Sequence, residues 1–169
     1  MAEPKIRRAN TLQARFGFAD PDLKKPEHDE IMGWLDANME DILMGVLSMP
    51  GRPKQVKTIW EPSVRMNEYS GQIIGFVDMS ARVNGVMMDE GHLVQDEKLV
   101  LFEAKTAIPS LGELFRQLQM YKAGYVGGRA VSGLKFVVTC PDDTDAQIIR
   151  DQGFHFLKYD PAMQFPPGL

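Results

Sequence analysis

The sequence predicts an α/β domain in which helices flank a central mixed sheet. Segments with apolar residues at helical spacing alternate with short apolar runs of strand length, in the order αβββαβ followed by αβ. The chain closes with strand, helix and strand over residues 134–159, a pattern typical of a parallel crossover. With 169 residues, 44% of them hydrophobic, the chain can bury one substantial core, and we expect one globular domain over residues 27–160.

The first half of the chain predicts one helix and three strands. Residues 1–26 are rich in Pro, Asp and Lys and are expected to form an N-terminal arm. Apolar side chains recur at helical spacing over residues 26–47, which predicts one long amphipathic helix that ends before Pro50-Gly51. Residues 55–64, 72–83 and 99–105 are predicted strands. Asn84-Gly85 predicts a tight turn, and residues 86–91 a short hairpin arm or a flexible loop.

The second half predicts two helices and two strands. Ser110 and Glu113 fit a capping box, so a helix begins here and Glu113 is assigned a structural role. Gly127-Gly128 ends this segment. Residues 134–139 and 154–159 are predicted strands on either side of a helix over 142–152, and 161–169 are expected to form a C-terminal tail.

Two carboxylates and a lysine stand at the ends of predicted strands. Asp78 ends the apolar run from Ile73, and Glu103-Ala-Lys105 ends the run from Leu99. Residues two apart in a strand share a face, so Glu103 and Lys105 extend the apolar face of Leu99 and Leu101. Desolvating a lone carboxylate is costly, so this placement calls for either a Mg²⁺ site or a buried ion pair.

The following helix carries Gln117 and Tyr121 one turn apart on one face. An Asp, then E-x-K, then a helix with Q-x-x-x-Y resembles the PD-(D/E)XK nuclease superfamily, and most closely the branch of RecB-type nuclease domains and lambda-type exonucleases. The resemblance covers residues 27–160. It implies the restriction-endonuclease-like fold, whose αβββαβ order the predicted elements match.

The resemblance also implies the composition of the active site. Asp78 and Glu103 would bind Mg²⁺ or Mn²⁺, with the carbonyl of Ala104 as a further ligand, and Lys105 would hold a water or help to deprotonate it. Gln117 and Tyr121 would orient the site and contact DNA phosphate. The alternative for this pair is packing between helix and sheet.

The family places an acid or a histidine from the first helix in the site. We expect Glu30 to take this place as a catalytic and metal-binding residue, and His28 is its rival. Glu61, which precedes Pro62, is another acidic candidate. Alternatively, the acids near the start of the helix only complement its N-terminal dipole.

Charge is distributed unevenly. The net charge of −4 argues against nonspecific coating of nucleic acid, but residues 103–135 hold five bases against two acids. We therefore expect Arg116 and Lys122 to contact DNA, together with Tyr121, whose contact the resemblance implies. Trp60 is a further candidate through base stacking, with core packing as the alternative.

Cysteine, histidine and apolar content bear on cofactors and location. The single cysteine, Cys140, excludes an internal disulfide and a four-cysteine iron–sulfur cluster, and no histidine or cysteine spacing indicates zinc. No apolar run approaches a membrane span or a signal peptide, so we expect a cytoplasmic protein.

The resulting expectation is a Mg²⁺-dependent deoxyribonuclease that acts on DNA, favours exonuclease action, and serves phage or mobile-element DNA processing, recombination or defence. A structure-specific or nicking endonuclease is the nearest alternative. A noncatalytic DNA-binding or protein-interaction module on the same fold is an alternative of another class. A homo-oligomer or a partner protein is left open.

Overall fold

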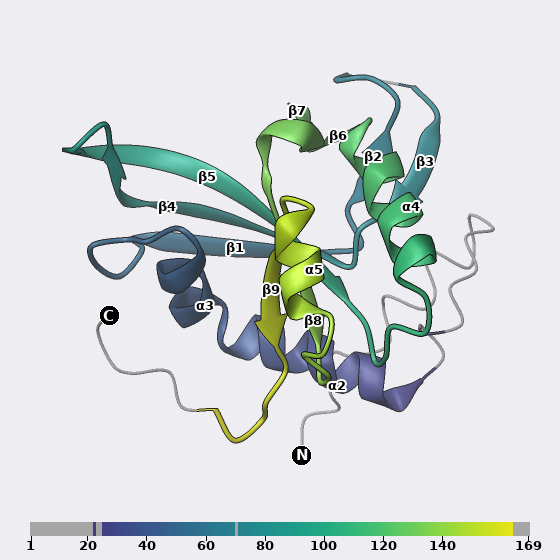
Figure 1. The fold of residues 1–169 in the computed structure, drawn as a ribbon. Coiled ribbons are helices and arrows are strands. Elements are labelled where there is room, and N and C mark those ends of the chain that lie inside the picture. Colours follow the sequence, from purple (N-terminus) through teal and green to yellow (C-terminus); the bar gives the residue numbers. More distant parts are fainter. Residues whose placement is uncertain (1–21, 23–24, 70, 164–169) are drawn as a thin grey trace, which may run out of the picture.

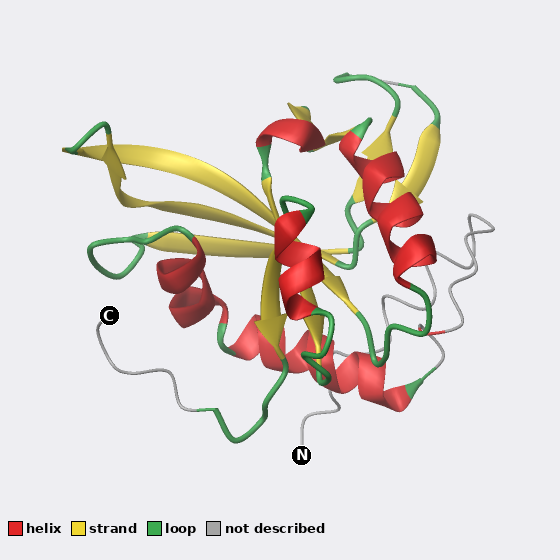
Figure 2. Cartoon of the chain, viewed as in Figure 1, coloured by secondary structure: helices red, strands yellow, loops and turns green. Residues whose placement is uncertain are grey.

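A computed structural model describes residues 22, 25–69 and 71–163, and the helices and strands are shown in Figures 1 and 2. The elements are α2 (Pro26–Ala37), α3 (Met39–Val46), β1 (Gln55–Trp60), β2 (Ser63–Arg65), β3 (Ile73–Phe76), β4 (Met79–Asp89), β5 (His92–Ala104), α4 (Leu111–Lys122), β6 (Tyr125–Val126), β7 (Arg129–Ala130), a 3₁₀ turn (Val131–Gly133), β8 (Lys135–Cys140), α5 (Ala146–Asp151) and β9 (His155–Lys158).

The main sheet has five strands in the order β1-β4-β5-β8-β9. β1, β4 and β5 pair antiparallel, while β8 and β9 continue the sheet in parallel with β5. The predicted mixed sheet and the closing parallel crossover are therefore confirmed. A second, smaller sheet with the order β3-β2-β6-β7 stands beside it, at the upper right of Figure 1.

Two apolar clusters cover the two faces of the main sheet. One cluster joins α2 and α3 to side chains such as Val100 and Phe102, and the other joins α4 and α5 to side chains such as Leu101 and Phe136. Successive residues of β5 alternate between the clusters, as the pleat of a strand requires. The site residues at the end of β5 therefore lie between two helical layers.

The single predicted helix over 26–47 is two helices. α2 ends at Ala37, where Asn38 donates from its side chain Nδ2 (2.8 Å) and its backbone N–H (3.1 Å) to the carbonyl of Trp34. Asn38 leaves helical geometry at φ −112°, and α3 begins at Met39. An asparagine side chain competes well for backbone groups, which explains why the apolar periodicity continues through a break in the backbone.

Two of the predicted strands also divide. Residues 55–64 break at Glu61, whose φ of 52° lies in the left-handed region. Residues 72–83 break at Val77 and Asp78, directly opposite. The N–H of Glu61 donates to the Asp78 carbonyl (2.9 Å), and the N–H of Val77 donates to the Pro62 carbonyl (3.1 Å), so the paired strands change direction together. This shared bend separates the two sheets.

The turn predicted at Asn84-Gly85 is wrong. β4 runs straight through it, with Gly85 paired to Asp96, and the chain reverses at Glu90-Gly91, where both residues have positive φ. Gly85 serves close packing instead: a Cβ there would stand 2.4 Å from Cε of Met49. Of the two alternatives for residues 86–91, the hairpin arm is confirmed: they form the outer part of the long β4–β5 hairpin (Figure 1).

The predicted N-terminal arm and C-terminal tail lie mostly outside the described residues. Asp22, within the predicted arm, is buried against the domain. No helix in the described ranges is long and apolar enough to cross a membrane.

Candidate active site

Asp78 lies in the bend between β3 and β4 and is almost fully buried, at 2% exposure. Its Oδ2 accepts a hydrogen bond from the backbone N–H of Ala104 at 2.8 Å. This bond ties the aspartate to the end of β5, 26 residues later in the chain. The predicted aspartate and the Glu103-Ala-Lys105 motif are therefore in direct contact in the folded protein.

Glu103 lies near the end of β5, and Lys105 directly follows that strand. Their side chains face the same side, as alternation along an extended chain predicts. Glu103 is 1% exposed and Lys105 is 9% exposed. Lys105 Nζ stands 3.1 Å from Glu103 Oε1. The backbone N–H of Lys105 donates to the Thr139 carbonyl (2.8 Å). This bond to β8 fixes the backbone that carries Glu103 and Lys105.

Helix α4 supplies Gln117 and Tyr121 to the same cluster. Gln117 Nε2 donates to Glu103 Oε1 (2.9 Å) and to the Tyr121 hydroxyl (3.0 Å), and that hydroxyl donates to the Phe76 carbonyl (2.9 Å). Ser110 caps the helix by accepting from the Glu113 N–H (3.3 Å), as predicted. The chain of hydrogen bonds thus connects the β3 backbone to Glu103.

Tyr121 is buried at 4% exposure, and its hydroxyl is engaged by protein groups. Burial, and secondly the charge of Glu103, raise the pKa of this phenol, so it stays neutral. The ring lies on β3 at Gly75, where a Cβ would come within 2.5 Å of Tyr121 Cε1. Tyr121 therefore holds Gln117 from inside the protein. Its hydroxyl is not exposed for the predicted contact with DNA phosphate.

Helix α2 contributes His28, the rival of Glu30. His28 is 1% exposed, and its Nε2 stands 3.3 Å from Asp78 Oδ2. Burial by itself would lower the pKa of His28, but the charge and hydrogen bond of Asp78, helped by Glu103 and Asp22, raise it to about 9. Burial would likewise raise the pKa of Asp78, and the charge of His28, above all, holds it below its usual range. At neutral pH this pair is an imidazolium and a carboxylate.

Glu30 does not join the cluster. Residues two apart on a helix are separated by about 200°, so His28 and Glu30 cannot face the same way. Glu30 is exposed, and its charge contributes to raising the pKa of Tyr159, after burial. The spacing of His28, Ile31 and Leu35, at i, i+3 and i+7, is the signal that could have favoured the histidine.

Glu61, the other acidic candidate, is buried beside the bend. Its backbone N–H reaches the Asp78 carbonyl. The glutamate thus helps to shape the backbone on which Asp78 stands.

One part of the site carried no sequence motif. Asp22 Oδ2 accepts from the Thr106 N–H (2.7 Å), Asp22 Oδ1 accepts from the Thr106 hydroxyl, and Lys25 Nζ reaches both Asp22 Oδ1 (2.9 Å) and Thr106 Oγ1 (3.2 Å). These bonds fasten the chain ahead of α2 to the residue that follows Lys105.

The predicted DNA contacts lie in different surroundings. Arg116 is 78% exposed on α4, within 4.0 Å of Glu113. Lys122 Nζ lies 4.3 Å from the centre of the Phe154 ring, at the last turn of α4. Trp60 packs against the core cluster of α2 and α3, which matches the packing alternative.

Two carboxylates, Asp78 and Glu103, are the donors from which a metal site could be built. Among the residues that the structure describes, no group of three His, Cys, Asp or Glu side chains is arranged to hold a metal ion. Mg²⁺ commonly binds proteins through only one or two carboxylates and completes its shell with water and substrate phosphate. Asp78 and Glu103 fit that requirement, and the Ala104 carbonyl as a ligand stays a prediction.

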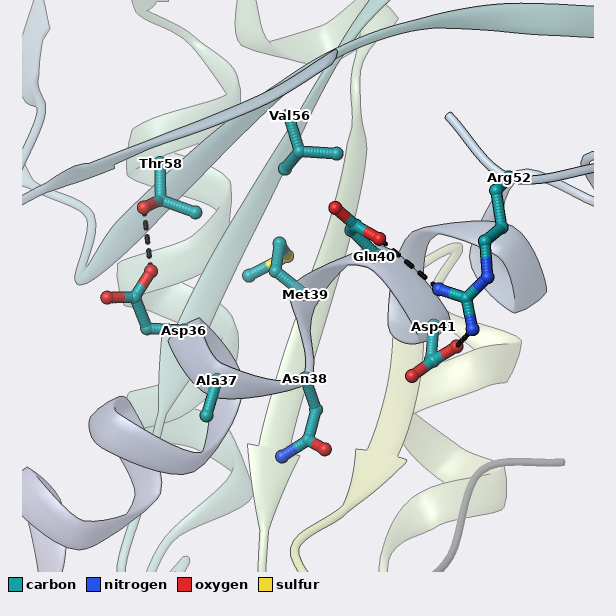
Figure 3. Close-up of a pocket in the computed structure, with 9 residues that line it drawn as sticks. All are labelled: Asp36, Ala37, Asn38, Met39, Glu40, Asp41, Arg52, Val56 and Thr58. Carbon is teal, nitrogen blue, oxygen red and sulfur yellow. Dashed lines mark hydrogen bonds and ion pairs between the residues drawn. The ribbon is translucent and has the colours of Figure 1, made fainter. Parts of the chain in front are cut away.

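A pocket of about 400 Å³ lies away from this cluster, at the junction of α2 and α3 (Figure 3). Arg52 pairs with Glu40 (3.2 Å) and Asp41 (3.5 Å), and Thr58 donates to Asp36 (2.7 Å). Its lining includes no residue of the cluster around Asp78 and Glu103.

No protein-family model matches this chain, and no curated protein matches its sequence. Among solved structures the chain is similar to EndoMS in a complex with double-stranded DNA, with 18% identity over 76% of this chain and 46% of that chain, and a TM-score of 0.37. It is also similar to a repair endonuclease from Pyrococcus abyssi, with 18% identity over 75% of this chain and 47% of that chain, and a TM-score of 0.32. The chain spans about half the length of each.

Proposed function

We propose that this chain is a divalent-metal-dependent DNA nuclease. The observation that carries the proposal is the convergence of Asp78, Glu103 and Lys105 in one buried cluster, linked by the Ala104 N–H bond and the 3.1 Å ion pair. Burying two carboxylates is unfavourable unless cations or hydrogen bonds compensate. A cluster that keeps both beside a lysine suits hydrolysis of a phosphodiester bond.

Each charged group has a role in this proposal. Asp78 and Glu103 would hold the metal, which when bound lowers the pKa of a water and stabilises charge on the scissile phosphate. Lys105 would hold the attacking water or, as a neutral amine, help to deprotonate it. The 3.1 Å contact with Glu103 supports the first of these roles, because it stabilises the charged ammonium beside the proposed metal ligand.

The remaining residues act by position. Gln117 fixes the carboxylate of Glu103, and Tyr121 fixes Gln117. His28 balances the charge of Asp78 from the opposite helical layer. Such support from neighbouring side chains keeps reactive groups in productive geometry.

The Q-x-x-x-Y resemblance favours exonuclease action on DNA ends in phage or mobile-element processing, recombination or defence. An endonuclease is the alternative within the same chemistry. A noncatalytic module, in which Glu103 and Lys105 form only a structural ion pair, is the alternative of another class.

One assay separates these alternatives. Purified protein is incubated with linear, closed circular and single-stranded DNA in Mg²⁺, Mn²⁺ or EDTA. Loss of linear DNA alone, abolished by EDTA, is the result expected for an exonuclease, and cutting of closed circles would indicate an endonuclease. Absence of cleavage under every condition would support the noncatalytic module.

Variants connect the activity to the cluster. Lys105→Ala should reduce cleavage by at least about 100-fold, as loss of a group that positions or activates the attacking water commonly does, while calorimetry still detects Mg²⁺ binding. Asp78→Ala should lose both. Arg52→Ala, in the pocket of Figure 3, is the matched control and should cleave like the unaltered protein. Full activity of Lys105→Ala would remove the lysine from the mechanism.

A further inference from the structure

A second cavity, of about 440 Å³, opens directly beside the cluster. Lys105 and Gln117 are part of its lining, so it is continuous with the groups proposed to act on the scissile phosphate. The segment that follows β5, the first turns of α4, and Asp22 and Lys25 ahead of α2 form the rest of its wall. A molecule in this cavity would therefore lie next to the reacting bond.

The wall of the cavity is largely apolar. Ala107, Ile108, Pro109 and Leu114 line it. Leu114 is buried in the cluster of α4 and α5, with Ile108 packed against it, so this wall is held firmly. Ala107 is exposed and can be exchanged without disturbing the core. An unpaired base can pack against apolar side chains such as these.

Cationic groups stand at two sides of the cavity. Lys105 borders the catalytic side, and Lys25, whose side chain is 51% exposed, borders the side of Asp22 and Thr106. Of the two acids in the lining, Asp22 is bound by Lys25 and Thr106, while Glu113 is 71% exposed near Arg116. Both ammonium groups are ion-paired, Lys25 with Asp22 (2.9 Å) and Lys105 with Glu103 (3.1 Å), but an ammonium has three N–H donors and can also reach a phosphate. An apolar wall between two such groups matches a nucleotide, with its base on the wall and its phosphates toward the lysines.

We propose that this cavity is a subsite for one unpaired nucleotide of the substrate, adjacent to the scissile phosphate. The inference rests on the proposed nuclease function and specifies its substrate class. A base inside a duplex cannot reach the wall because its partner and its stacked neighbours surround it. DNA that carries an unpaired nucleotide beside the cut is therefore preferred over fully paired DNA.

Binding tests the subsite without cleavage. Fluorescence anisotropy in EDTA compares a blunt duplex with the same duplex carrying a single-stranded overhang. Packing of one base against the apolar wall should make the overhang bind about tenfold more tightly. Equal affinity for the two DNAs would overturn the proposal.

Two variants locate the effect. Ala107→Glu puts a carboxylate into the cavity and should abolish the preference, so that the overhang and the blunt duplex bind with about equal affinity. Ala130→Glu adds the same charge at an exposed position in β7, outside the cavity, and should keep the tenfold preference. Melting temperatures verify that both variants are folded. A preference that survives Ala107→Glu would contradict the assignment.

A competition experiment separates a nucleotide from a simple anion. Deoxyadenosine monophosphate should displace the overhang DNA from the unaltered protein at a concentration where inorganic phosphate does not. Equal displacement by both would reduce the cavity to an anion site and overturn the proposal.

Cleavage, measured separately in Mg²⁺, tests the nuclease function independently of the nucleotide subsite. A protein that cleaves DNA without preference for unpaired nucleotides would lose the subsite and keep the proposed function. A protein that prefers the overhang and never cleaves would keep the subsite and lose the nuclease assignment.

Discussion

At the scale of single residues, each buried acid of the cluster has its own basic partner. Asp78 stands against His28, and Glu103 against Lys105. The distribution matters because removing one member of a buried pair leaves the other desolvated, which costs more than the pair contributed. The charges of the cluster therefore depend on one another for stability as well as for the proposed chemistry.

The His28–Asp78 pair should make stability depend on pH in metal-free protein. The pKa of His28 is raised from 6.5 to about 9 in the folded state, so folding takes up a proton between these values. Its contribution is fully present below about pH 6.5 and is lost as pH rises through about 9, by an amount on the order of 1 to 3 kcal/mol.

Urea unfolding in EDTA from pH 6 to 10 measures this loss. His28→Gln should flatten the alkaline part of the profile. His155→Gln is the control, because burial and Lys135 lower the pKa of His155. Its removal should therefore leave the loss of stability at alkaline pH unchanged. An unchanged profile in His28→Gln would show that another group titrates.

Tyr121→Phe should lower stability by about 1 to 3 kcal/mol. The change removes the hydroxyl that donates to the Phe76 carbonyl and accepts from Gln117, and it leaves the buried carbonyl and the partly buried amide without that partner. Cleavage should also fall, because Gln117 loses one of the two contacts that hold it against Glu103. Thermal unfolding and a nuclease assay measure the two effects, and a variant of unchanged stability would contradict the buried hydrogen-bond chain.

At the scale of elements, the shared bend of two strand pairs creates the site. β1 with β4 and β2 with β3 break at Glu61 and Asp78, and the two breaks are hydrogen-bonded to each other. If the strands ran straight, Asp78 would be paired within the sheet. Residues of α2 and α4 could then not both approach it. The position of α4 over β3 depends in turn on Gly75, which leaves room for the Tyr121 ring.

Gly75→Ala tests this close approach. A Cβ at 2.5 Å from Tyr121 Cε1 forces the ring or the strand to move, so stability should fall by about 1 to 3 kcal/mol and cleavage should fall with it. Gly45→Ala in α3 is the opposite control. Nothing lies within 4 Å of a Cβ there, and a helical alanine should stabilise by about 0.5 to 1 kcal/mol. Melting temperature and cleavage rate of both variants decide the matter.

At the scale of the whole molecule, one sheet carries two cores and should unfold as one unit. Alternate residues of β5 belong to the two clusters, so neither helical layer can leave without exposing the strand that the other covers. Domains of this size commonly unfold in a single cooperative transition.

Leu35→Ala and Leu118→Ala test this coupling from opposite faces. Both side chains are fully buried, and each truncation should cost roughly 2 to 5 kcal/mol. Trp34 and Trp60 both pack on the α2 side, so their fluorescence reports that layer alone, whereas far-UV circular dichroism reports all elements. Leu118→Ala should shift both transitions equally. A fluorescence transition that does not respond would reveal two independent units.

The sequence by itself determined the fold class, the order of the elements and the motif residues that meet. Periodicity and turn residues carry these signals locally, so Glu103 and Lys105 could be assigned to one face, and Ser110 to a helix cap, before any contact was known. The resemblance to the PD-(D/E)XK pattern added the roles expected of Asp78 and Gln117 and the proposed chemistry.

Only the tertiary structure decided which neighbours complete the site. Glu30 and His28 are two residues apart in sequence, and the choice between them depends on how α2 is rotated against the sheet. Asn84-Gly85 has the composition of a turn, yet pairing with β1 and β5 keeps it within β4. Tyr121 and Asp22 are polar residues whose partners lie 45 and 84 positions away. Local patterns record the backbone preference of each segment, whereas these outcomes depend on contacts between distant segments, which exist only once the sheet and both helical layers are assembled.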